Sequence, residues 1–207
     1  EEITPVFPQQ IYEAGILELQ DIIAPSALQV NPSFVRLGEK VARTLFVFSY
    51  PRYLAMSWFA PIINLDTVFD VSIFIHPVDT ALILRQLRKK VAEVQSQIAE
   101  RERKGFVRDP MLDTAHQDLE TLRERLQQAQ ERLFSFGLYV TIYGDTIEEL
   151  DKTEAEMRSI LESKLVYAKQ ALFQQQEGME TVFPLASDKL RVHTYLNSSP
   201  VSSVFPF

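Results

Sequence analysis

The stretch LRQLRKKVAEVQSQI (residues 84–98), together with LDTAHQDLETLRERLQQAQERL (residues 112–133), decides how this chain folds. Its apolar residues recur every three or four positions, which is the spacing that lines one face of an α-helix. Gly105 and the pair Asp109-Pro110 interrupt the pattern, and Asp109 is suited to cap a helix that starts at Pro110. The sequence therefore predicts an antiparallel, coiled-coil helical hairpin over about residues 79–133, with each arm on the order of 30 Å long.

A strand with alternating apolar residues is predicted on each side of this hairpin. The apolar positions before it are Phe69, Val71, Ile73 and Ile75, and those after it are Phe134, Phe136, Leu138, Val140 and Ile142. A period of two is typical of a strand with one buried face. Because the hairpin separates two core strands, we expect it to be an insertion that protrudes from the body.

Three further strands are predicted near the start of the chain. Residues 27–30 and 34–37 are short apolar runs around Asn31-Pro32-Ser33, whose composition favours a turn. Residues 41–49 are rich in β-branched and aromatic side chains and stop before Pro51. Residues 1–20 mix Pro and Gln with scattered apolar residues, so we expect them to form an extended arm.

The region after the second core strand predicts two helices and another strand. Thr146 to Glu149 has the form of a capping box, so a helix should begin there and run to about Ser163. Residues 165–168 should form a strand, and residues 171–177 a short helix closed by Gly178. The predicted fold class is therefore α+β: a ferredoxin-like β-α-β-α-β sheet body with an N-terminal β-hairpin region and the inserted helical hairpin.

The overall composition restricts the class of partner. The 207 residues carry a formal net charge of -7, which opposes long-range attraction to nucleic acid or anionic lipid. Cysteine is absent, so the sequence offers no disulfide framework and no thiolate nucleophile. No apolar run approaches the roughly 18 residues that cross a bilayer. The sequence thus indicates a cytoplasmic protein, and its start without Met suggests a segment of a longer chain.

No motif for catalysis or cofactor binding stands out in the sequence. None of the six glycines opens a phosphate-binding loop that ends in Lys-Ser/Thr. His76, His116 and His193 are far apart and lack the spacing of metal ligands. Residues 136–140 resemble the aromatic strand of RNA-recognition motifs only in part, because no basic residue leads them. We therefore expect no catalytic, cofactor-binding or metal site in this segment.

Two places contain residues suited to contact a partner protein. The tip of the predicted hairpin is locally basic with one apolar residue, and the residues concerned are Arg101, Arg103, Lys104, Phe106 and Arg108. This composition suits an acidic or membrane-proximal partner, and a solvated loop is the alternative. Trp58 lies in the apolar stretch 56–63, which is suited either to anchor on a partner or to form a short helix under the sheet.

Seven short blocks follow one another along nearly the whole chain from Asp21 on. They are DIIAP (21–25), RTLFV (43–47), YPR (50–52), Trp58 with PII (61–63), DVSIFIHP (70–77), FGLY (136–139) and DTIEEL (145–150). In number and order, and with a helical hairpin between them, these blocks resemble the amino-terminal region of conjugative-transfer (type IV secretion) ATPases of the TraC/VirB type.

The resemblance implies a non-catalytic docking domain at residues 21–197, with a linker at 198–207 toward a C-terminal P-loop ATPase domain that this segment lacks. ATP and Mg would belong to that missing domain, and no small-molecule substrate is expected here. The implied partners are inner-membrane components of the secretion channel, the protein's own ATPase domain and its own copies, at the inner face of the membrane. The alternative is a nucleic-acid-binding module that guides transferred single-stranded DNA.

Overall fold

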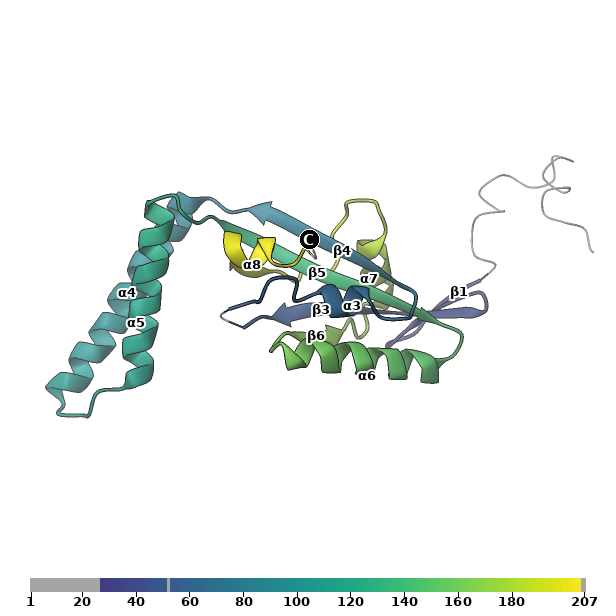
Figure 1. Cartoon of the computed structure of the whole chain (residues 1–207), viewed down its shortest axis with the longest axis horizontal. Helices are drawn as coiled ribbons and strands as arrows, with labels where there is room; N and C mark the ends of the chain where they lie inside the picture. The colour runs from purple at the N-terminus through teal and green to yellow at the C-terminus, as the bar shows by residue number, and fades with distance from the viewer. Residues whose placement is uncertain (1–26, 52, 206–207) are drawn as a thin grey trace, which may run out of the picture.

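The two longest strands, β3 (Lys40–Ser49) and β5 (Leu133–Gly144), lie side by side in an antiparallel sheet. The computed structural model describes residues 27–51 and 53–205, and the predicted arm at 1–20 lies outside them. Figure 1 shows the sheet as the body of the molecule, with a pair of helices projecting from one end. The combination of helices with an antiparallel sheet confirms the α+β class.

Across the described residues, the sheet has seven strands in the order β1-β2-β3-β5-β4, with β6 paired to β3 and β7 paired to β5. All of these pairs are antiparallel. The outer strands are β1 (Leu28–Val30), β2 (Val35–Leu37), β4 (Phe69–Pro77), β6 (Tyr167–Gln170) and β7 (Thr194–Asn197). The strands predicted on either side of the helical hairpin and at the start of the chain are therefore confirmed.

Helices cover both faces of the sheet. One face packs against α3 (Ala60–Ile63), α6 (Ile147–Ser163) and α8 (Ser198–Ser202), and the main core lies between them. Its fully buried members include Val41, Leu45, Leu138, Ile142, Leu150, Met157 and Leu161. The opposite face packs against α7 (Gln175–Val182) and the segment 190–192, around Tyr139. β5 is therefore buried on both faces, whereas its apolar alternation predicted only one.

α6 begins and ends where the sequence predicts. The Thr146 hydroxyl accepts a hydrogen bond from the Glu149 N–H at 3.2 Å, and the Glu149 carboxylate accepts one from the Asp145 N–H at 2.8 Å. These two bonds satisfy backbone donors that the first turn of a helix leaves unpaired. After α6 the chain differs from the prediction: Leu165 has a φ of 57° in a turn, so β6 starts at Tyr167.

Gly178 lies inside α7, so the prediction of a helix at 171–177 closed by this glycine is wrong. A Cβ atom at position 178 would lie 2.7 Å from the Thr44 Cβ on β3. The Gln175 side chain also accepts a hydrogen bond from the Thr44 N–H at 2.8 Å. Glycine is therefore needed here because α7 approaches the sheet too closely for any side chain.

Replacing Gly178 by alanine should destabilise the protein, although alanine is the better helix former. Intrinsic helix propensity alone favours alanine by about 1 kcal/mol. The clash of the new methyl group with Thr44 should outweigh this gain and lower the free energy of unfolding by about 1–3 kcal/mol. Neither backbone can move away easily, because both are fixed by regular structure. Urea unfolding of Gly178→Ala tests this, with the exposed neighbour Gln176→Ala as control. A Gly178→Ala variant more stable than the native chain would contradict the close approach.

The projecting helices are α4 (Thr80–Arg103) and α5 (Pro110–Gln127). Asp79 and Asp109 cap them by accepting hydrogen bonds from backbone N–H groups two residues on, at 2.8 Å and 3.0 Å. The helical pattern was predicted to continue to residue 133, but α5 ends at Gln127. The chain must turn there to enter β5, and Ala129 has a φ of 56°.

The root of this hairpin is attached to the sheet by apolar contacts. Ile83 and Leu126 from the two helices are buried with Leu133, the first residue of β5.

The C-terminal end of the described chain differs from the prediction. Residues 198–205, expected to belong to a linker, contain α8 and contribute Val201 and Val204 to the main core. The body therefore extends to residue 205.

Candidate functional site

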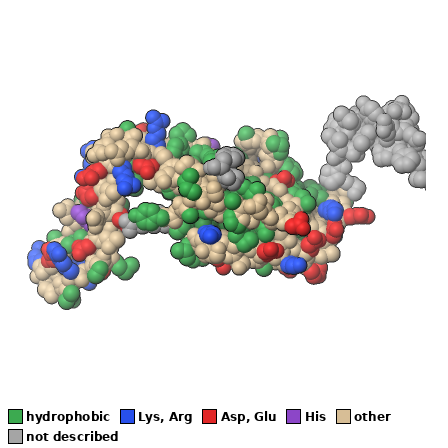
Figure 2. All heavy atoms as spheres, in the orientation of Figure 1, with side chains coloured by type: hydrophobic (Ala, Val, Ile, Leu, Met, Phe, Trp, Pro, Cys, Tyr) green, Lys and Arg blue, Asp and Glu red, His purple; other side chains and the backbone are tan. Residues whose placement is uncertain are grey.

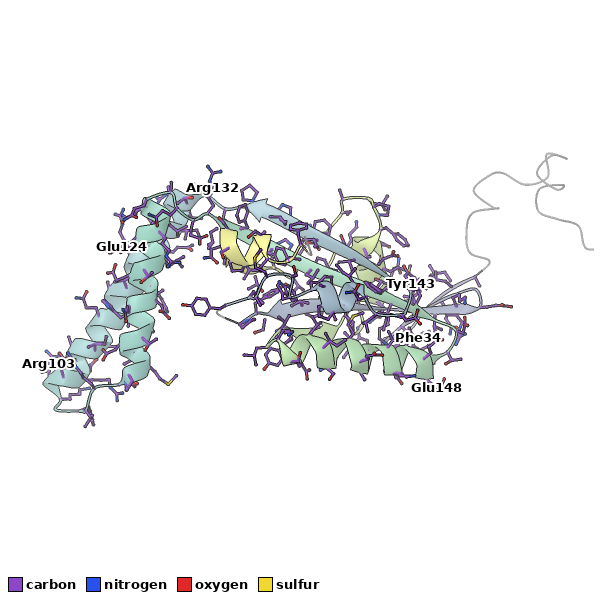
Figure 3. The ribbon with its side chains drawn as sticks, in the orientation of Figure 1. Phe34, Arg103, Glu124, Arg132, Tyr143 and Glu148 are labelled. Atoms are coloured by element: carbon purple, nitrogen blue, oxygen red, sulfur yellow. The ribbon has the colours of Figure 1, made fainter. Side chains whose placement is uncertain are left out.

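The free end of the hairpin holds most of the residues predicted to contact a partner. Figure 3 labels Arg103 at this end and Arg132 at the root. α4 ends through Gly105, whose φ of 74° allows the chain to reverse. The Gly105 and Phe106 N–H groups then donate to the carbonyls of Glu102 and Arg101, at 3.0 Å and 3.1 Å. This glycine-dependent helix end directs Phe106 outward at the tip.

The basic residues of the tip are largely matched by carboxylates. Arg101 faces Asp109 at 3.8 Å, Lys104 faces Glu100 at 2.7 Å, and Arg108 faces Glu102 at 3.7 Å. Over residues 100–113, the bases Arg101, Arg103, Lys104 and Arg108 balance the acids Glu100, Glu102, Asp109 and Asp113. The stretch 101–108 carries four bases and one acid, so it is locally basic as the sequence indicates, and the flanking acids Glu100, Asp109 and Asp113 balance its charge.

Exposed apolar side chains distinguish the tip from the rest of the hairpin. Phe106 is 59% exposed, Val107 87% and Met111 82%. Figure 2 shows hydrophobic side chains next to Lys and Arg at this end. The Arg101 guanidinium lies 5.8 Å from the centre of the Phe106 ring, which is a cation-π distance. The tip is thus an apolar surface bordered by paired charges, and we name Phe106, Val107 and Met111 the tip patch.

Trp58 is not available to a partner. It is 2% exposed and lies in the main core, and its ring meets Tyr50 edge to face at a centroid distance of 6.0 Å. The short helix that was the alternative interpretation forms directly after it, as α3. The proposed anchoring role of Trp58 is therefore corrected to a core role, because α3 folds its side chain beneath the sheet.

A Ser-His-Asp arrangement that no local motif in the sequence indicates lies on the face of the sheet that α7 covers. The Ser135 hydroxyl is 2.8 Å from His193 Nδ1, and His193 Nε2 is 2.5 Å from Asp188 Oδ2. Such an arrangement is also found at the nucleophile of hydrolases. Here, however, Ser135 lies within the sheet, because β5 pairs with β4 on one side of it and with β7 on the other.

The other contacts of this cluster fit an anchoring role. The Tyr139 hydroxyl contacts Asp188 at 3.1 Å and accepts a hydrogen bond from the Val192 N–H at 2.9 Å. Burial, followed by the charge of Asp188, raises the pKa of Tyr139 above its ordinary value of 10.0. A Cβ at Gly137 would lie 2.7 Å from the His193 ring, so this glycine makes room for it. The cluster holds the segment 188–193 against β5.

A buried ion-pair network joins β3 to α6. Arg43 is 3% exposed, and its guanidinium contacts Asp151 at 2.7 Å and Glu154 at 2.8 Å. Its Nε donates to the Ser33 carbonyl at 2.9 Å, which ties in the turn between β1 and β2. Because Asp151 is largely exposed while Glu154 is buried, Glu154 is the partner whose charge most needs Arg43.

Within residues 27–51 and 53–205, no group of three or more His, Cys, Asp or Glu side chains is placed to hold a metal ion. In the same part of the chain, no helix is both long and apolar enough to cross a membrane. No protein-family model matches the chain, and a search of curated proteins found no match.

Proposed function

We propose that this chain is a docking and assembly domain without catalytic activity, in a cytoplasmic ATPase of the conjugative-transfer (type IV secretion) type. The sequence blocks described above motivate the family. In this proposal the sheet body packs against the protein's own ATPase domain, which binds ATP and Mg. The hairpin reaches inner-membrane components of the channel at the cytoplasmic face of the membrane.

The observation that carries the proposal is the tip patch. Apolar side chains that are exposed at a loop tip far from the core do not stabilise the fold, and their contact with water is unfavourable. Phe106, Val107 and Met111 nevertheless lie at the end of α4 and α5, the point of the hairpin farthest from the body. Exposed aromatic and apolar side chains are typical of protein interfaces, and the three residues are close in sequence at the free end of the hairpin.

The length of the hairpin supports the same role. α4 has 24 residues, and at 1.5 Å per residue this places the tip about 36 Å from the root. Val91 and Val94 are buried in the middle of the arm, and most other side chains there are polar and exposed. We infer that the arms pack as a short coiled coil, which makes the hairpin a stiff spacer rather than a binding groove.

We also propose that the body has a ferredoxin-like core, which the order of its strands and helices supports. The central strands lie in the spatial order β6-β3-β5-β4, and α3 and α6 occur in the connections from β3 to β4 and from β5 to β6. These helices lie on one face of an antiparallel sheet, as in a ferredoxin-like fold. The hairpin then replaces the short turn between the second and third strands of that core.

Polar substitution of the tip patch should weaken partner binding without affecting the fold. The variant carries Phe106→Ser, Val107→Ser and Met111→Ser, and its affinity for the purified inner-membrane components of the secretion channel is measured in detergent by biolayer interferometry. Loss of a central aromatic residue with two neighbours should weaken binding by about 10-fold or more.

The matched control removes exposed apolar residues from the body instead. Leu172 and Phe173 are 55% and 82% exposed in the turn before α7. Leu172→Ser with Phe173→Ser should leave the affinity unchanged. Equal affinity of the tip variant and the native chain, or an equal loss in the body control, would reject docking through the tip patch.

A further inference from the structure

Within residues 27–51 and 53–205, no strand pairs with the outer edge of β4. All nine residues pair with β5 on the inner side, from Phe69 opposite Ile142 to Pro77 opposite Phe134. β4 is the last strand in the sheet order. Among the described residues, no backbone hydrogen bond reaches its outer side. As far as the described part of the chain is concerned, a row of backbone N–H and C=O groups on this edge can accept another strand.

The sequence of β4 lacks the usual protection of an edge strand. Such strands are commonly short, bulged, or interrupted by Lys or Pro, which prevents further pairing. β4 reads FDVSIFIHP: it contains no Lys or Arg, its proline comes only at the end, and its pairing with β5 is continuous. On the opposite side the sheet ends in β1, of three residues, and β6, of four, which are both too short to support a comparable interface.

We propose that the outer edge of β4 pairs with β4 of a second copy of this chain, antiparallel, with Ile73 on the two-fold axis. In this register Asp70 lies opposite His76 of the second copy, and symmetry produces this acid-imidazole pair twice. Val71 lies opposite Ile75 and Ile73 opposite itself, on the face that packs against the main core. The strand is therefore complementary to its own reversed copy in hydrophobicity, and its one acid faces an imidazole that can form a hydrogen bond with it.

The position of the hairpin leaves this edge accessible. In Figure 1, β4 forms the upper edge of the sheet, and α4 and α5 extend from their root toward the opposite side. Because the second β4 would run in the opposite direction, its hairpin would start from the other end of the shared sheet. The tip patches would then be far apart, so self-pairing goes beyond the docking role and does not depend on it.

Engineered disulfides can test the register, because the native sequence contains no cysteine. Ile73→Cys would place two thiols opposite one another at the axis, within the Cα separation of about 4.4–6.8 Å that a disulfide requires. Val71→Cys would leave its two copies about 13 Å apart, because four residues of strand separate them. Under mild oxidation we expect covalent dimers from Ile73→Cys, and from a mixture of Val71→Cys with Ile75→Cys, but not from Val71→Cys alone.

Sedimentation equilibrium of the full chain provides the second measurement. The native chain should dimerise reversibly, and so should the tip-patch variant. His76→Asp would place two carboxylates opposite each other at both symmetry-related positions and should weaken the dimer by about 10-fold. Adding Asp70→Lys to that variant should restore it. A native chain that stays monomeric, or cross-linking that is equal at all three cysteine positions, would overturn the proposal.

Discussion

Replacing Arg43 by methionine should lower the free energy of unfolding by about 3–5 kcal/mol, because the change leaves a buried carboxylate without its counter-charge. Glu154 is 5% exposed, and its remaining contacts are Gln170 and a weaker pair with Arg158 at 3.4 Å. Arg43 also tethers the Ser33 carbonyl, which would lose its donor. Guanidinium-induced unfolding followed by circular dichroism measures the effect.

Two further variants separate the ion pair from simple loss of volume. Arg43→Met combined with Glu154→Leu removes both charges, so it should recover much of the lost stability. Lys40→Met removes an exposed pair with Asp145 on the surface and should leave the unfolding midpoint nearly unchanged. If Arg43→Met is as stable as the native chain, Arg43 does not hold α6 on the sheet.

Replacing Trp58 by alanine should cost about 3–5 kcal/mol, because it creates a large cavity in the main core. The Trp58 ring packs edge to face against Tyr50 and Phe59, at centroid distances of 6.0 Å and 5.4 Å. Thermal unfolding of Trp58→Ala should show a lower midpoint, whereas Met56→Ala, at a 73% exposed neighbour, should not. Normal stability of Trp58→Ala together with weaker partner binding would instead support the anchoring role first suggested by the sequence.

Periodicity allowed most of the secondary structure to be predicted from the sequence. The three-four spacing around Val91 and Leu119 marks helices, and the alternation around Ile73 and Leu138 marks strands, because each pattern reflects one buried face. The starts of α5 and α6 could also be predicted, because capping is local. Asp109 and Thr146 accept hydrogen bonds from backbone groups only two or three residues away.

Features that depend on contacts between distant residues could not be predicted in this way. From the sequence, Gly178 was interpreted as the end of a helix. Its real role depends on the close approach to Thr44, which is far away in the sequence. The same holds for Arg43 with Glu154 and for Ser135 with His193, which are separated by 111 and 58 positions. The tip residues were identified from composition alone, but the ion pairs of Arg101 with Asp109 and of Arg108 with Glu102 depend on how Gly105 reverses the chain.

The central claim is that the body folds independently of the hairpin and that the hairpin carries the docking function. Shortening the hairpin tests this claim most directly. Replacing residues 90–120 by a short glycine-serine loop retains Ile83 and Leu126 at the root, which are buried with the first residue of β5. The measurement is the affinity of this variant for the channel component that binds the native chain, with the unfolding midpoint as the check on folding. We predict an unchanged midpoint and loss of binding. Full affinity in the shortened chain would contradict docking through the hairpin.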